Sequence, residues 1–308
     1  MSVALLPIRA AMWLDYVVIM PVAAACSWRL ALWWGRRRGD LMFWWRAVGR
    51  RAAIDNVRRA FGGAITYADA HQVVRASFRT QTCEEVETFF FRALTRVDYE
   101  RYVRIEGRQH LEAAVAQGRG AIVFSYHYGS MCLAMIALAH LGFQVNVLAR
   151  SIAGSENPLA PAVRYYARRK VAQLERIMGR PFIVAGEQGA MLKIRRALRD
   201  GEIVYVLLSV PPELARRRAH VRFLGQPAQV PAGTELIATL TGAPLVPFVV
   251  RPSPRGIGHV LEIRPEVPGP AAGAGTTQRC LDVIERWVWE QPGPLFMWEF
   301  AQSFWVEE

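Results

Sequence analysis

The sequence has 308 residues, of which 52% are hydrophobic and 21% charged, a balance that suits a well-packed chain of one large domain or two small ones. Its net charge is +12, nearly all of it from arginine, since lysine occurs only at Lys170 and Lys193; such a charge favours phosphate-bearing partners. The sequence predicts neither a disulfide framework nor a zinc site, because the four cysteines are far apart and form no CxxC pair: Cys26, Cys83, Cys132 and Cys280. We expect neither a metal site nor a bound cofactor.

The N-terminal region predicts contact with a membrane. Ala10–Trp28 reads AAMWLDYVVIMPVAAACSW and carries a single charge, at Asp15. It is close to the length of about 20 residues that a spanning helix needs, and a cluster of arginines and tryptophans follows it. Indole rings beside arginines favour the lipid headgroup layer, and a positive flank stays on the cytoplasmic side. We expect a single anchor or a deeply inserted interfacial helix in residues 1–50, and the main domain in residues 51–308.

Basic residues interleaved with aromatic ones can also bind single-stranded nucleic acid. The adjoining apolar helix favours the membrane, so we expect no nucleic-acid partner.

The remainder predicts an α/β fold. The pattern is helical from Arg50 to about Arg104 and then alternates between helices and short apolar runs. The expected strands are Ala121–Tyr126, Gln144–Leu148, Pro181–Ala185, Ile203–Val210, Pro244–Val250 and Val260–Arg264. The expected helices are His110–Gln117, Ser130–Leu141, Leu159–Met178, Ala190–Arg199, Ala232–Thr241 and Thr277–Glu290. This alternation predicts a sheet covered by helices.

The most informative local feature is SYHYGS, residues 125–130. A buried strand ends, His127 follows, then Gly129, and a helix begins. Ligands of open α/β sheets bind where strands end at their carboxyl side. An imidazole there can take a proton from an attacking hydroxyl, and backbone N–H groups at the helix start can stabilise an oxyanion. A histidine that only caps a loop is the alternative.

Several blocks, in order, resemble a known family. They are RIEGRQHLEAAVAQGRGAIVFSYHYGS, Arg150 followed by Asn157-Pro158-Leu159, RRALRDGEIVYVLLS, VRFLGQPAQVPAGTELIATLTGAPLVPFVV and PLFMWEF. Together they run from about Asp55 to Phe304. The chain thereby resembles the bacterial lipid A lauroyl/myristoyl acyltransferases of the lysophospholipid acyltransferase superfamily.

The resemblance implies a glycerolipid acyltransferase-like fold, with a mixed, mostly parallel sheet, helices on both faces and one hydrophobic N-terminal anchor helix. It implies an enzyme on the cytoplasmic face of the bacterial inner membrane. The donor would be an acyl carrier protein or acyl-CoA thioester. The acceptor would be a hydroxyl, or an amine, of a membrane lipid or glycolipid.

The family motif is a histidine followed five positions later by an aspartate or glutamate, and the resemblance makes His127 the general base. The acidic position is Cys132 in this chain. Three interpretations stay open. Cys132 is an inert small residue, and another carboxylate such as Glu187, or a backbone carbonyl, orients His127. Alternatively, Cys132 is a nucleophile that forms an acyl-enzyme. In the third, catalysis is lost and a silent acyl- or lipid-binding subunit remains.

Two further segments depart from the family pattern, and four matched positions are candidates for binding substrate. Leu208-Ser209-Val210-Pro211 replaces an acidic element, and Glu299-Phe300-Ala301-Gln302 replaces the usual basic ending. Both changes predict altered contacts to the acceptor, so an acceptor other than lipid A is a further alternative. Arg150 and Arg222 are candidate substrate-binding residues, and Gly225 and Gly233 belong to the same matched block as Arg222. Arg164, Arg168, Arg169 and Lys170 are expected to form the solvated face of a helix.

Overall fold

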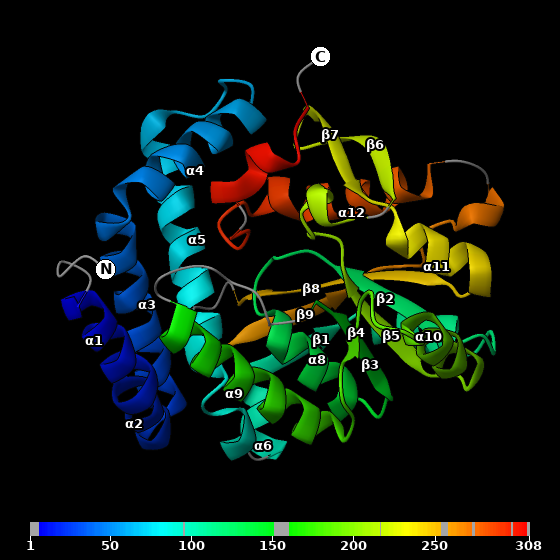
Figure 1. Cartoon of the computed structure of the whole chain (residues 1–308), viewed down its shortest axis with the longest axis horizontal. Helices are drawn as coiled ribbons and strands as arrows, with labels where there is room; N and C mark the ends of the chain where they lie inside the picture. The colour runs from blue at the N-terminus through cyan, green and yellow to red at the C-terminus, as the bar shows by residue number, and fades with distance from the viewer. Residues whose placement is uncertain are drawn as a thin grey trace.

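The computed structural model describes residues 6–94, 96–150, 160–215, 217–253, 258–272, 275–296 and 298–306. Its centre is a seven-stranded sheet in the order β1-β9-β8-β2-β5-β3-β4 (Figure 1). The strands are β1 (Val103–Glu106), β2 (Ala121–Ser125), β3 (Val145–Ala149), β4 (Ile183–Val184), β5 (Ile203–Leu207), β8 (Leu245–Pro252) and β9 (His259–Ile263). Only β8 and β9 pair antiparallel. The predicted mixed, mostly parallel sheet is confirmed.

Helices cover both faces of the sheet, as predicted. Every residue of β2 is buried, as is usual for the central strand of a parallel sheet. Because side chains alternate along a strand, Ile122 and Phe124 join the core of one face, and Ala121 and Val123 that of the other. The first face packs against α10 (Ala190–Arg199), α11 (Gly233–Thr241) and α12 (Thr276–Glu290). The second packs against α7 (Arg108–Val115), α8 (Met131–His140) and α9 (Ala160–Met178).

A layer of helices flanks the sheet on its left in Figure 1. It contains α1 (Leu6–Leu14), a π-helical turn (Asp15–Ile19), α2 (Met20–Cys26), α3 (Trp28–Trp45), α4 (Ala47–Ala60) and α5 (Tyr67–Glu87). α6 (Arg96–Tyr102) follows and leads into β1. Gly39 of α3 lets the backbones of α3 and α5 come close, because a Cβ there would lie 2.6 Å from the Cα of Arg79.

The apolar N-terminal segment packs against the rest of the protein on one side. Arg9–Cys26 spans 18 residues with a mean hydropathy of 1.4, so its length and composition would allow it to cross a membrane. Its one acidic residue is paired internally, since Asp15 accepts hydrogen bonds from Trp34, at 3.0 Å, and from Arg38. Arg38 also binds Glu85 of α5, which ties the N-terminal helices to the body of the protein.

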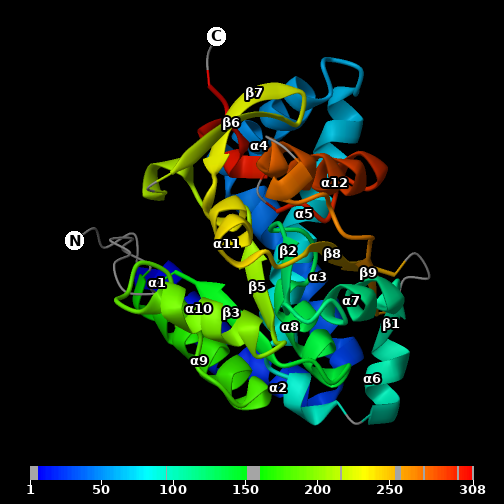
Figure 2. The same ribbon diagram turned by 90° about the vertical axis from the view of Figure 1, so that its right-hand side faces the viewer.

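Two elements differ from the sequence-based prediction. The stretch predicted to stay helical until Arg104 ends earlier, and β1 forms at the edge of the sheet beside β9. The second is a two-stranded hairpin, β6 (Arg218–Phe223) and β7 (Gln226–Pro231), which is separate from the main sheet. Figures 1 and 2 both show this hairpin beside α12, at the end of the molecule where the C-terminus lies.

Candidate functional site

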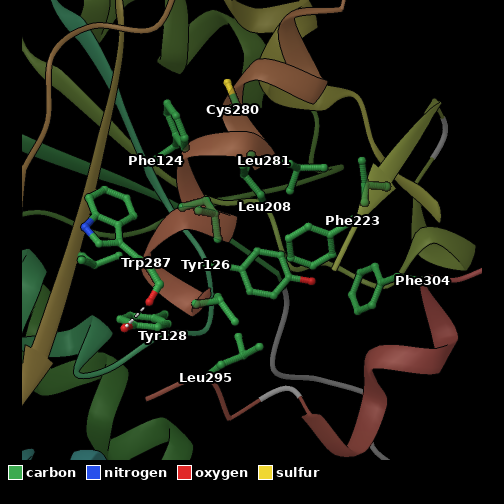
Figure 3. Close-up of a cluster of buried hydrophobic side chains, with 14 of the residues drawn as sticks. Phe124, Tyr126, Tyr128, Leu208, Phe223, Cys280, Leu281, Trp287, Leu295 and Phe304 are labelled. Atoms are coloured by element: carbon green, nitrogen blue, oxygen red, sulfur yellow. Dashed lines mark hydrogen bonds between the residues drawn. The ribbon is translucent and has the colours of Figure 1, made fainter. Parts of the chain in front are cut away.

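The segment that carries His127 is held in place by its two neighbours. Tyr126 and Tyr128 are both 1% exposed and belong to the core between the sheet, α12 and the hairpin (Figure 3). The ring of Tyr126 lies 5.2 Å from that of Phe223 on β6. The hydroxyl of Tyr128 donates to the carbonyl of Trp287 at 3.0 Å (Figure 3). His127, between these two buried residues, is partly exposed.

Gly129 is required by the path of the backbone. It has φ +65, and a Cβ there would lie 1.5 Å from the carbonyl oxygen of Val250 on β8. No side chain can be accommodated at this distance, and left-handed backbone itself favours glycine. The chain therefore passes directly over the end of β8 and enters α8 at Met131.

The backbone N–H groups around the histidine are already used within the protein. His127 donates to the Ser209 hydroxyl, Tyr128 to the Tyr126 carbonyl, Gly129 to the Pro294 carbonyl and Ser130 to the Val250 carbonyl. The N–H groups of residues 127–130 are thus not free to stabilise an oxyanion. The expectation for the helix start concerns the first turn of α8, which begins at Met131, and it stays a prediction.

Ser209 orients the imidazole of His127. Its hydroxyl lies against Nδ1 of the ring and also accepts the His127 backbone N–H at 3.1 Å. Ser209 follows β5, the strand next to β2, and is 1% exposed. An Nδ1–H bond to this hydroxyl leaves the lone pair of Nε2 as the basic site. The structure thus gives the ring a hydroxyl partner rather than the Glu187 carboxylate or the backbone carbonyl that we considered.

The surroundings of His127 favour its neutral form. Burial, and secondarily the positive charge of Lys170, lower the pKa of His127 from its ordinary 6.5 to about 4. The imidazole also packs nearly perpendicular to the ring of Phe296, with 5.5 Å between the ring centres. The histidine is therefore an unprotonated acceptor of protons at neutral pH.

A buried charge cluster lies next to this histidine. Cys132 donates a hydrogen bond from Sγ to Oε1 of Glu84 at 2.8 Å, and Nζ of Lys170 lies 3.8 Å from the same oxygen. Burial raises the pKa of Glu84, and Lys170 and Cys132 oppose that rise. Burial and the nearby Glu84 raise the pKa of Cys132 well above its ordinary value. Cys132 is thus a thiol that helps to hold a carboxylate supplied by α5.

Lys170 does not lie on a solvated helix face, which corrects our expectation for this residue. Burial lowers the pKa of Lys170, but the attraction of Glu84 outweighs burial, and the pKa is raised overall. The side chain is therefore a fixed positive charge beside His127. One signal was available in the sequence, because lysine occurs only twice in a chain full of arginine.

The other predicted residues lie apart from this cluster. Arg150 and Glu187 are exposed. They follow the carboxyl ends of the adjacent parallel strands β3 and β4, just as His127 follows the carboxyl end of β2. Residues 151–159, including Asn157-Pro158-Leu159, lie outside the described residues. Arg222 and Gly225 are exposed at the tip of the hairpin, where Arg222 donates to the Gly225 carbonyl at 3.2 Å. Gly233 is the first residue of α11.

No metal site is formed by the part of the chain that the structure describes, in which no group of three or more His, Cys, Asp or Glu side chains could hold an ion. The site is built from an imidazole, a hydroxyl, a lysine and a carboxylate.

Comparison with known proteins identifies the family. No curated protein matches the chain. The family model described as "Bacterial lipid A biosynthesis acyltransferase" matches residues 3–300, which is nearly the whole chain. The match includes the apolar N-terminal helix, the sheet and the segment that carries His127. The chain therefore belongs to the bacterial lipid A biosynthesis acyltransferase family, whose members transfer an acyl group to a lipid acceptor.

Proposed function

We propose that this acyltransferase moves an acyl group from a carrier-protein or CoA thioester to a hydroxyl, or an amine, of a membrane lipid or glycolipid, with His127 as general base. The observation that carries the proposal is a partly exposed imidazole at the carboxyl end of β2, oriented by Ser209 and held neutral. A neutral imidazole with a free Nε2 can accept the proton of an attacking group.

The proposed reaction proceeds through a tetrahedral intermediate. Nε2 of His127 takes the proton of the acceptor hydroxyl, and the oxygen attacks the thioester carbonyl carbon. The carbon–sulfur bond then breaks, and the departing thiolate receives the proton from the imidazolium. The oxyanion is stabilised by the positive charge of Lys170, which acts on His127, and by backbone N–H groups in the first turn of α8.

An acyl-Cys132 intermediate is disfavoured. The attacking species would be the thiolate, and the pKa of Cys132 is raised well above its ordinary value. A silent acyl- or lipid-binding subunit is the remaining rival, because no carboxylate follows His127 at position 132. Measuring both turnover and protein-bound label with a labelled thioester distinguishes these possibilities.

We propose that residues 1–50 attach the enzyme to the cytoplasmic face of the bacterial inner membrane and that residues 51–308 form the acyltransferase domain. Support comes from exposed apolar side chains on the N-terminal helices: Trp13, Leu14, Val17, Val18, Val22, Leu30, Trp33, Leu41, Trp44 and Trp45. The guanidinium groups of Arg29 and Arg37 lie over the rings of Trp28 and Trp33. This mixture suits the headgroup layer of an anionic membrane.

The proposal is tested with purified protein in lipid nanodiscs, an acyl thioester labelled in its acyl group, and total lipid from the source bacterium. Both carriers, acyl carrier protein and CoA, are tried. We expect labelled lipid to accumulate and no label to remain on the protein by intact-mass measurement. Thioester that binds without turnover would indicate the silent subunit, and a labelled Cys132 would indicate covalent catalysis.

A further inference from the structure

The turn that connects α1 to α2 places one tyrosine inside the protein. Asp15–Ile19 forms a π-helical turn, an irregularity that is frequent at functional sites. Within it Tyr16 is only 3% exposed, whereas Val17 and Val18 are 44% and 46% exposed. The apolar N-terminal segment therefore has two sides, one available to lipid and one built into the protein.

The buried side packs against α9, the helix that carries Lys170. The ring of Tyr16 is stacked on that of Tyr166, with 5.0 Å between the ring centres and 18° between the planes. One residue earlier on α9, the ring of Tyr165 lies 5.3 Å from that of Trp13. Because aromatic rings pack in preferred geometries, these pairs fix α9 relative to the N-terminal segment.

Tyr166 in turn contacts Lys170. The two residues are four apart on α9, so their side chains share one face of the helix. Nζ of Lys170 lies 5.4 Å from the centre of the Tyr166 ring, a cation–π distance. The lysine is thus held by this ring and by the Glu84 carboxylate, and its charge, after burial, lowers the pKa of His127.

Hydrogen bonds hold the polar ends of both tyrosines. The Tyr16 hydroxyl accepts from Nη2 of Arg38 at 3.2 Å and donates to Oε2 of Glu85 at 3.4 Å. The Tyr166 hydroxyl donates to the backbone carbonyl of the same Glu85, also at 3.3 Å. Both rings are therefore tied to one residue of α5, which keeps the stacked pair in register.

We propose that Tyr16 is a positioning residue for acyl transfer: it holds the ring of Tyr166 in place and thereby fixes Lys170 in the catalytic site. The N-terminal segment then completes the catalytic site in addition to attaching the protein to the membrane. The inference rests on the role proposed for Lys170, whose charge has to be in place when the oxyanion forms. Loosening Tyr166 should therefore slow transfer and leave the binding of the thioester unchanged.

The position of Lys170 is measured directly, without any reaction. Because lysine occurs only at two positions, full-length protein labelled with ¹³C-lysine in nanodiscs gives two Cε signals, and Lys193→Arg assigns them. Tyr16→Leu removes the stacked ring and should shift the signal of Lys170, on which the ring current of Tyr166 acts, but not that of Lys193. Tyr16→Phe keeps the ring and should leave both signals near their wild-type positions.

Two further variants complete the measurement. Trp13→Leu, at a more exposed site, should shift the Lys170 signal less than Tyr16→Leu does. Tyr67→Leu removes an exposed ring at the start of α5 and is the matched control. A Lys170 signal that stays at its wild-type position in both Tyr16→Leu and Trp13→Leu would overturn the proposal.

Transfer kinetics with the labelled thioester and the lipid extract test the consequence for catalysis. We expect Tyr16→Leu to lower kcat about 10-fold to 100-fold with KM for the thioester unchanged, and Tyr16→Phe and Tyr67→Leu to keep the wild-type kcat. A changed KM with an unchanged kcat would overturn the positioning role. Turnover that is lost in His127→Ala but unchanged in Tyr16→Leu would refute this inference alone, whereas turnover unchanged in His127→Ala would refute the proposed function.

Discussion

The protonation of His127 offers a quantitative prediction about the site. Its pKa is lowered to about 4 from an ordinary value of 6.5. At pH 5.5 the neutral fraction should therefore be about 97%, against about 9% for an unperturbed histidine. Since only the neutral ring is a base, kcat/KM should stay nearly constant down to about pH 5.

The titration is measured by nuclear magnetic resonance on protein labelled at ¹³Cε1 of its six histidines. The signal of His127 is assigned as the one absent from His127→Gln. A chemical shift that stays constant from pH 8 to pH 5 agrees with the structure. A midpoint near 6.5 for that signal would refute the argument, because it would mean that the ring is neither desolvated nor close to a fixed cation.

The lowered pKa of His127 also makes the stability of the folded protein depend on pH. The unfolded chain binds a proton at His127 as pH falls through 6.5, whereas the folded chain does so only near pH 4. Stability is therefore lost as pH falls across this window, by at most about 3 kcal/mol from this residue. Chemical denaturation should show a smaller loss over the window for His127→Gln than for the wild type. Equal losses would contradict the assignment.

Further predictions concern the surrounding residues. Cys132→Ala should change the rate of acyl transfer less than about threefold, because the thiol is buried and protonated. For the same reason, iodoacetamide should leave Cys132 of the wild type unmodified at pH 7. A 100-fold loss of rate in Cys132→Ala would indicate that Cys132 is a nucleophile. Lys170→Met should destabilise the fold by about 3–5 kcal/mol in denaturant titrations, because Glu84 is left buried without its cation, and Lys170→Arg should recover part of the loss. Gly129→Ala should lower stability by more than about 3 kcal/mol, whereas Gly118→Ala, at φ +77 but with open space around it, should cost only about 1 kcal/mol. Equal costs for the two glycines would contradict the close approach at Gly129.

Most of the fold could be predicted from the sequence because the buried strands are short apolar runs. Ala190–Arg199 was predicted with the bounds that the structure has, and Leu159–Met178 differs from α9 by one residue. The hairpin was missed because most residues of its strands are exposed or half-exposed, so they form no apolar run, and because the strands contain prolines and arginines. Its core contacts, such as Phe223 with Tyr126, join residues far apart in the chain.

The candidate site could be predicted only in part, for a similar reason. His127 could be predicted as a site residue because a buried strand, a histidine, a glycine and a helix follow one another directly in the sequence. Ser209 lies 82 residues from His127, and Glu84 lies 48 residues from Cys132, so no local pattern joins them. The sequence itself places Cys132 five positions after His127. The carboxylate beside it became visible only once α5 was packed against α8.

The most direct test of the account is acyl transfer by His127→Ala in a single-turnover reaction with labelled thioester and the acceptor identified from the lipid extract. His110→Ala, on the surface helix α7, is the matched control. We predict a loss of 100-fold to 10,000-fold for His127→Ala, about the usual contribution of a general base, with an unchanged melting temperature at pH 7.5. Transfer at the wild-type rate by this variant would contradict the account.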